Sequence, residues 1–201
     1  MHADTPSKFE FPFEITICGI EELPGHAERK VSHVLSIVDP DHGELEAFGT
    51  YGEHARLELR FHDIIEETPG EEAPQPHHVE RILTFGRDIL HEPEALRHLL
   101  VHCHMGVSRS TAAMTLLLAQ AQPQLSARDV LHQVLGIRDK AWPNLRMLTF
   151  GEEQLGRRGE FTGAVGEIYR IQIDRRPQIR EFFREAGRAR EVELALRARP
   201  L

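Results

Sequence analysis

A cysteine, an arginine and two serines stand close together in the passage Leu99–Ser110, which reads LLVHCHMGVSRS. Cys103 follows an apolar run, Arg109 comes six positions later, and Ser110 stands beside it. A thiolate can attack an electrophilic centre, and a guanidinium can hold an anion such as phosphate at two oxygens. This spacing predicts nucleophilic chemistry by Cys103 on a phosphate-bearing substrate.

The passage also predicts how an anion would be held. An apolar strand that leads directly into a helix N-terminus turns successive backbone N–H groups into one concavity, which binds oxyanions. The same field stabilises a thiolate at Cys103, and the Ser110 hydroxyl can hydrogen-bond its sulfur. Gly106 allows the tight turn. We expect the phosphate to be bound by the loop residues, namely His104, Met105, Gly106, Val107, Ser108 and Arg109.

His102 precedes the nucleophile. A preformed thiolate needs no base, so we expect His102 to be a buried imidazole that supports the loop by hydrogen-bonding its backbone.

At this point the chain resembles a known family. Cys103 to Arg109 matches the CX5R signature of the protein tyrosine phosphatases, in the extended form His-Cys-X-X-Gly-X-X-Arg-Ser. The chain is most similar to small dual-specificity-like members of bacterial type, loosely over residues 13–155 and not over 160–201. The resemblance implies hydrolysis of a phosphate monoester through a cysteinyl-phosphate intermediate, without metal or cofactor. Phosphotyrosine is the implied substrate, with dual specificity left open.

The resemblance also implies a general acid, an aspartate on a separate upstream loop. Asp63 is the candidate, because it follows the predicted strand Ala55–Phe61 in the sequence FHDIIEE. No Trp-Pro-Asp triplet is present, and a plain turn role for Asp63 stays open, with Glu66 and Glu67 as substitutes. Asn144, in Pro143-Asn144, either braces the phosphate loop or caps a helix.

Other functions remain as alternatives. A phosphate-reading pseudophosphatase would keep the loop as a binding module, but nucleophile, arginine and acid are all present here. A phosphoinositide or other phosphate ester phosphatase gains from extra cations, and the loop interior has none unless His104 is protonated. A sulfur-transfer protein would not require Arg109 and Ser110 at these positions.

The composition of the chain limits the partners that we expect it to bind and the cellular compartment in which we expect it. The chain has 24 Lys and Arg against 32 Asp and Glu, a formal charge of −8, which argues against nucleic-acid binding. The segment 157–201 is locally basic, and we expect it to face the acidic body. Two cysteines form no disulfide framework, and no apolar run suggests a secretion signal or membrane span, so a cytoplasmic location is expected. We expect phosphorylated proteins or small phosphate esters as substrates, and phosphate, sulfate or vanadate as loop ligands.

The remaining reactive residue types have simpler interpretations. Cys18 lies in an apolar pattern and is expected in the core, with a role as resolving thiol for Cys103 as the alternative. The 13 histidines repeat no zinc spacing, so no metal site is expected.

Alternating elements predict the fold. Strand patterns lie at Phe13–Ile20, His33–Val38, Ala55–Phe61 and His98–His102, and helical patterns at Pro76–His91, Ser110–Ala121, Val130–Leu135 and Leu145–Leu155. This order predicts an α/β fold with a mostly parallel sheet of four to five strands flanked by helices. We expect a phosphatase domain over 1–160 and a helical extension over 161–201 packed on it. Within the extension, Asp174–Arg199 is expected to be a solvated helix without chemistry.

Overall fold

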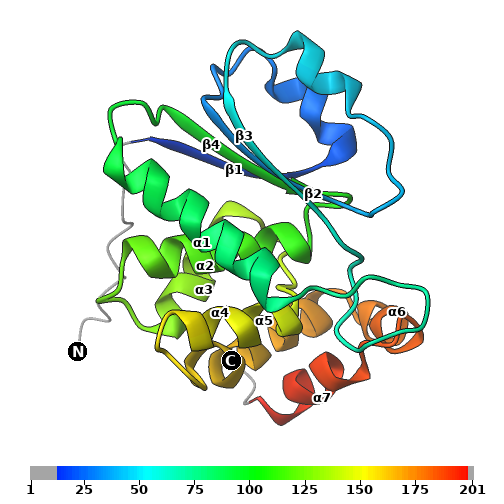
Figure 1. Ribbon diagram of the computed structural model, residues 1–201. Coiled ribbons are helices and arrows are strands. Elements are labelled where there is room, and N and C mark those ends of the chain that lie inside the picture. The colour runs from blue at the N-terminus through cyan, green and yellow to red at the C-terminus, as the bar shows by residue number, and fades with distance from the viewer. Residues whose placement is uncertain (1–12, 199–201) are drawn as a thin grey trace.

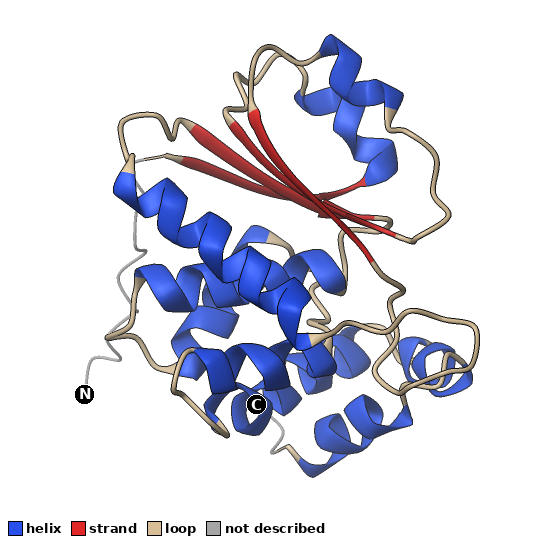
Figure 2. Cartoon of the chain, in the orientation of Figure 1, coloured by secondary structure: helices blue, strands red, loops and turns tan. Residues whose placement is uncertain are grey.

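The computed structural model describes residues 13–198 and contains one parallel sheet of four strands (Figures 1 and 2). The strand order is β1–β4–β2–β3. The N-terminal segment, in which we expect no secretion signal, lies outside the described residues. The strands are β1 Glu14–Gly19, β2 His33–Val38, β3 Ala55–Arg60 and β4 His98–Cys103.

The sheet confirms the predicted α/β fold, and its strands begin and end within one residue of the predicted bounds. The inner strands β2 and β4 are apolar and almost wholly buried, as expected for a parallel sheet covered on both faces. All four strands run the same way, so their carboxyl ends meet at one edge. Asp39, Asp63 and Cys103 stand at or just beyond these ends and are therefore brought together.

Four α-helices pack beneath one face of the sheet (Figure 1). Helix α2 contacts β4 and is buried on nearly every side, which explains its continuous apolar sequence. Ser126 caps α3 by accepting from the Asp129 N–H. The helices are α1 Pro76–His91, α2 Arg109–Ala121, α3 Ala127–Ile137 and α4 Leu145–Gln154.

The opposite face is covered differently. Two short 3₁₀ helices, η1 Ile20–His26 and η2 Glu46–Thr50, lie over it, and η1 packs against η2 and β1. They enclose a second, smaller apolar cluster that contains Cys18, Leu23 and Phe48. The segment between β2 and β3 therefore includes a helical turn with a buried phenylalanine.

The C-terminal part differs from the prediction. The expected single helix over Asp174–Arg199 is wrong, because the chain breaks near Pro177 and again at Gly187, which has φ 73°. Arg199 itself lies outside the described residues. Helix α5 packs on α3 and α4, and α7 packs on α5. The three helices are α5 Glu160–Arg175, α6 Ile179–Glu185 and α7 Ala189–Arg197.

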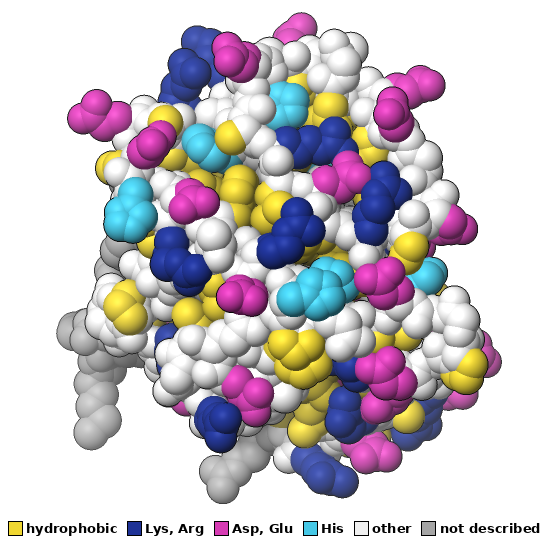
Figure 3. All heavy atoms as spheres, in the orientation of Figure 1, with side chains coloured by type: hydrophobic (Ala, Val, Ile, Leu, Met, Phe, Trp, Pro, Cys, Tyr) yellow, Lys and Arg dark blue, Asp and Glu magenta, His cyan; other side chains and the backbone are white. Residues whose placement is uncertain are grey.

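The charged surface agrees with the expected pairing of the basic C-terminal segment with the acidic body. Arg176 contacts Asp139 at 2.9 Å, and Arg190 contacts Glu66 at 3.2 Å. On the face shown in Figure 3, Lys and Arg side chains are scattered among Asp and Glu side chains. Among the described residues, no helix is long and apolar enough to cross a membrane.

Candidate active site

The loop between β4 and α2 turns its carbonyl groups outward. The His104 carbonyl accepts from the Ile20 N–H at 3.0 Å, and the Val107 carbonyl accepts from the Trp142 N–H at 2.8 Å. The Met105 and Gly106 carbonyls accept from the Arg138 guanidinium at 3.1 and 2.9 Å.

Because these carbonyls face outward, the amides of the loop are left free. Within residues 13–198, no N–H from His104 to Ser108 donates a hydrogen bond. Free amides ahead of a helix N-terminus form a concave nest that favours an oxyanion. The loop thus offers free N–H donors, which is what the sequence predicted for phosphate binding.

Arg138 braces the loop from outside, a role that sequence reasoning missed. Its guanidinium donates to both Glu22 carboxylate oxygens, at 2.9 and 2.5 Å. Glu22 in turn accepts from the Gly19 N–H at 2.6 Å, which connects this brace to the end of β1. Arg138 lowers the pKa of Glu22 to about 2, so the pair stays ionised at neutral pH.

Gly106 is required by geometry. Its φ is +65°, and a Cβ there would lie 2.4 Å from the Cys18 carbonyl carbon. We expect Gly106→Ala to lower the free energy of unfolding by about 2 kcal/mol or more, through backbone strain and overpacking. Gly136→Ala is the matched control, because Gly136 lies in α3 with open space around its Cβ position. Urea unfolding of both variants measures the difference, and equal stabilities would contradict this account.

The candidate nucleophile lies at the bottom of the nest. Cys103 is 2% exposed, and its Sγ lies 3.2 Å from the Ser110 Oγ in the first turn of α2. A hydroxyl at this distance can donate to a thiolate. The structure therefore places Ser110 where the sequence predicted it.

Within residues 13–198, the Arg109 guanidinium is hydrogen-bonded to the protein along one edge only. Its Nη1 donates to the Asp39 Oδ1 at 2.6 Å and to the Phe61 carbonyl at 2.5 Å. Its Nε is buried without a hydrogen-bond partner in the described chain. Anchored on one side, Arg109 keeps its Nε and Nη2 groups for two oxygens of a bound phosphate. Asp39 was not predicted as a site residue, although it directly follows β2 at the same sheet edge.

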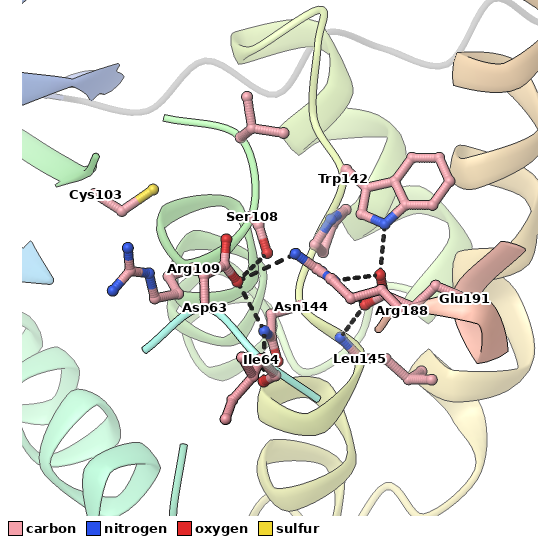
Figure 4. Close-up of polar contacts among 12 residues, drawn as sticks. Asp63, Ile64, Cys103, Ser108, Arg109, Trp142, Asn144, Leu145, Arg188 and Glu191 are labelled. Atoms are coloured by element: carbon pink, nitrogen blue, oxygen red, sulfur yellow. Dashed lines mark hydrogen bonds and ion pairs between the residues drawn. The ribbon is translucent and has the colours of Figure 1, made fainter. Parts of the chain in front are cut away.

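Asp63 faces the same space (Figure 4). Its Oδ1 accepts from the Ser108 hydroxyl at 2.7 Å, from the Asn144 amide at 2.9 Å and from the Arg188 guanidinium at 3.2 Å. Burial alone would raise the pKa of Asp63, but Arg188, Arg109 and these hydrogen bonds outweigh it and lower the pKa. Asp63 is therefore ionised at neutral pH when no substrate is bound.

Asn144 serves both roles that the sequence left open. Its Oδ1 accepts from the Met147 N–H and caps α4, while its Nδ2 donates to Asp63 and to the Ile64 carbonyl at 3.2 Å. Its own N–H lies 3.4 Å from the Ser108 carbonyl. Asn144 thus connects the start of α4 to the segment that contains Asp63 and to the loop between β4 and α2.

His102 is buried as expected and packs near Phe48, with ring centroids 5.6 Å apart. Burial lowers its pKa to about 3, against a smaller opposing effect of the Cys103 backbone. Neither ring nitrogen has a partner with good hydrogen-bond geometry within the described part of the chain, so the Cys103 backbone is at most a weak partner. The ring is neutral at pH 7 and packs against Phe48 of η2.

This burial predicts a pH effect on stability. The unfolded chain protonates His102 near 6.5, whereas the folded chain does so only near 3. Stability is therefore lost as the pH falls through this window, by about 1.4 kcal/mol per pH unit for this group. We expect His102→Leu to reduce the proton uptake on unfolding by about one proton, measured by urea unfolding across this pH range. An unchanged pH slope would contradict the interpretation.

His104 is not a cation in this site. Burial and then Arg109 lower its pKa, and its Nε2 accepts from the Asp39 N–H at 3.2 Å. The protonated His104 that would have favoured a phosphoinositide is therefore not supported. Met105, beside it, is 63% exposed at the rim.

Cys18 and the candidate nucleophile belong to different apolar clusters, although their strands are neighbours. Cys18 pairs in register with His102 across β1 and β4 and belongs to the apolar cluster under η1, whereas Cys103 belongs to the main core on the other face. Burial raises the pKa of Cys18 to about 12, so it stays protonated. These observations favour the core role of Cys18 over the resolving role.

One cavity of about 670 Å³ joins these groups. Cys103, Arg109 and Asp63 all line it. Its far wall comes from the C-terminal part, for which the sequence predicted no chemistry. Helix α6 and its flanks provide Arg176, Gln178, Ile179, Phe182, Phe183, Ala186 and Arg188. No group of three or more metal-type ligands occurs among residues 13–198.

No family model matches the sequence, and no curated protein matches it significantly. Solved structures share its fold. The active form of Tk-PTP superposes with a TM-score of 0.51 at 21% identity, covering 76% of this chain and 99% of that one. Cydia pomonella PTP-2 phosphatase gives 0.55 at 16% identity, covering 70% and 84%. PTPMT1 in complex with PI(5)P gives 0.50 at 14% identity, covering 71% and 90%. The chain therefore has the protein tyrosine phosphatase fold, as the resemblance predicted.

Proposed function

We propose that this chain is a phosphate monoester hydrolase in which Cys103 forms a cysteinyl-phosphate intermediate. The observation that carries the proposal is the single cavity that Cys103, Arg109 and Asp63 share beneath a nest of free amides. Nucleophile, anion site and proton donor are the parts that this reaction needs, and each comes from a different element at one sheet edge.

The first step transfers the phosphoryl group. The Cys103 thiolate attacks phosphorus, an S–P bond forms, and the P–O bond to the leaving group breaks. The negative charge of the bound ester raises the pKa of Asp63, so Asp63 is protonated in the complex. It gives this proton to the leaving oxygen, which departs as a neutral alcohol or phenol. The loop amides and the free edge of Arg109 hold the charge on the three phosphoryl oxygens.

The second step restores the enzyme. Water attacks phosphorus, Asp63 takes a proton from that water, and the S–P bond breaks to release phosphate and the thiolate. Ser110 donates to the leaving sulfur, from which its Oγ lies 3.2 Å away. Each bond that forms is matched by one that breaks, and the proton given up by Asp63 returns to it.

The cavity wall supports an aryl ester such as phosphotyrosine. Ile179, Phe182 and Phe183 line it opposite the loop, and the lining is mainly apolar. Phe182 is 56% exposed, so its ring is available to stack on an aromatic leaving group. We infer a preference for phosphotyrosine over phosphoserine, whose short alkyl group would leave this wall uncovered.

A second candidate, a phosphoinositide, is supported by cations outside the loop. Lys140 and Arg176 line the same cavity, and the structurally similar PTPMT1 was solved with PI(5)P. Both cations lie outside the loop interior, residues 104–108, which contains no lysine or arginine. Phosphate release from a phosphotyrosine peptide and from a short-chain phosphoinositide, at equal concentration, separates the two candidates.

The test of the function itself is hydrolysis of para-nitrophenyl phosphate in EDTA, between about pH 4 and 8. We expect turnover that vanadate inhibits, because vanadate occupies the same anion site. Phosphate binding without turnover of the aryl ester, the peptide or the lipid would instead identify a phosphate-reading module.

A further inference from the structure

A buried ion pair from the C-terminal part reaches the candidate acid. Arg188, the residue before α7, is 3% exposed, and its Nε and Nη2 each donate to the Glu191 carboxylate at 2.8 Å. The remaining amino group, Nη1, donates to the Asp63 Oδ1 at 3.2 Å. Figure 4 shows the guanidinium lying between the two carboxylates.

Glu191 is itself fixed by the core. It is fully buried and accepts from the Trp142 Nε1 at 2.6 Å, from the Leu145 N–H at 2.9 Å and from the Tyr169 hydroxyl at 3.3 Å. A carboxylate with this many donors keeps one orientation. Arg188 is therefore held by the start of α4 and by α5, as well as by its own helix.

Within the described residues, the hydrogen bonds to the Asp63 carboxylate all end on one of its two oxygens. Ser108, Asn144 and Arg188 all donate to Oδ1. The other oxygen, Oδ2, makes no hydrogen bond with residues 13–198 and is not sealed from solvent. The side chain is 31% exposed and lines the cavity. Since a proton would displace a donor from Oδ1, the acidic proton belongs on Oδ2.

We propose that Arg188, locked by Glu191, is a positioning residue that holds the Asp63 carboxyl with Oδ2 toward the leaving group. The inference rests on the proposed function, because it assumes that Asp63 donates the proton. It assigns a role to the C-terminal part of the chain, because Arg188 and Glu191 would complete the part of the site that holds Asp63.

The charges around Asp63 give this role a pH signature. Arg109 and Arg188 both lower the pKa of Asp63, and removal of Arg188 takes away one of these cations. The pKa of Asp63 should then rise, and with it the pH above which the acid is unprotonated and turnover declines. The charged or titratable groups that interact with Asp63 are Arg188, Arg109, His104 and Tyr169, while Glu191 lies on the far side of Arg188 (Figure 4).

The test compares Arg188→Met and Arg188→Lys with wild type on two esters. Phenyl phosphate has a poor leaving group that needs the acid, and para-nitrophenyl phosphate has a good one. For Arg188→Met we expect kcat on phenyl phosphate to fall about tenfold or more, and kcat on para-nitrophenyl phosphate to fall less, because only phenol needs a proton as it departs. We expect the alkaline limb of the pH profile to move up by about one pH unit. Arg188→Lys keeps the charge, so its alkaline limb should stay near that of wild type.

Two controls separate positioning from general damage. Arg197→Met lies on the same helix with its side chain 77% exposed and should behave as wild type. In an Asp63→Asn background, Arg188→Met should cause no further loss, because both changes act on one group. If Arg188→Met does not fold, Arg188→Lys and Glu191→Gln, which weakens the lock, must still show the selective loss on phenyl phosphate.

The outcomes are distinguishable. Equal losses on both esters with an unmoved alkaline limb, or a further loss in the Asp63→Asn background, would overturn the role of Arg188. A second outcome is that Asp63→Asn shows the selective loss on phenyl phosphate expected for a general acid, whereas the Arg188 variants match wild type. In that case only this inference fails, and the proposed function stands. If wild type hydrolyses neither ester, and neither the phosphotyrosine peptide nor the phosphoinositide, the proposed function fails and this inference fails with it.

Discussion

Cys103→Ser is expected to abolish turnover of every phosphate ester, by on the order of 10⁴-fold or more, while phosphate binding persists. A serine hydroxyl is nearly the size of the thiol but is not ionised at neutral pH, so no nucleophile remains. The free loop amides and the Arg109 edge are unchanged and still hold an anion. Steady-state kinetics measure the loss, and isothermal titration with inorganic phosphate measures the binding.

The matched control is Cys18→Ser. Cys18 is equally buried but belongs to the cluster under η1, so this variant should lose some stability and keep its turnover. Measurable turnover by Cys103→Ser, or equal losses in the two serine variants, would remove the basis for a cysteine mechanism.

The second large effect on turnover is expected for Asp63→Asn. We expect kcat on phenyl phosphate to fall about 10²- to 10⁴-fold, and kcat on para-nitrophenyl phosphate to fall less, because only the poor leaving group needs a proton as it departs. Asparagine keeps an oxygen to accept from Ser108 and Arg188, so the site should stay folded. The alkaline limb of the pH profile should disappear, since the group that titrates there is gone.

The neighbouring acids provide the control for this variant. Glu66 is 56% exposed and pairs with Arg190, and Glu67 is 66% exposed and pairs with Arg146. Their side chains do not line the cavity. Glu66→Gln and Glu67→Gln should therefore leave kcat unchanged. Full activity of Asp63→Asn, together with a loss in either glutamine variant, would transfer the role of acid to that glutamate.

The sheet and the helices beneath it could be predicted because their signals are local. Four apolar runs, each followed by turn residues, correspond to the four strands, and Pro76 begins α1 at the residue expected. The phosphate loop was equally accessible, since a cysteine, a glycine and an arginine occur within seven residues between a strand and a helix. The roles of these residues in catalysis stay predictions.

The C-terminal part was misjudged because charge patterning does not reveal burial. Arg188 and Glu191 read as a solvated pair at helical spacing, yet both are buried and ion-paired in the core. The break between α6 and α7 had a signal in Gly187, and the break before α6 had one in Pro177. Nothing local in the sequence indicates that these helices return to the edge of the sheet.

Two further site residues depend on tertiary geometry. Asp39 orients Arg109, and the signal for it was its place directly after β2, where parallel strand ends meet. Arg138 reaches the loop carbonyls from the end of α3, a long-range contact that has no signature in the sequence around it.

The most direct test of the cysteine mechanism is to look for its intermediate. Para-nitrophenyl phosphate transfers its phosphoryl group without needing an acid, whereas hydrolysis of the intermediate needs Asp63 as a base, so Asp63→Asn should accumulate phosphoenzyme. Acid quench followed by peptide mass spectrometry is predicted to find one phosphoryl group on Cys103. Turnover without phosphoenzyme, or a phosphoryl group on any other residue, would contradict the account.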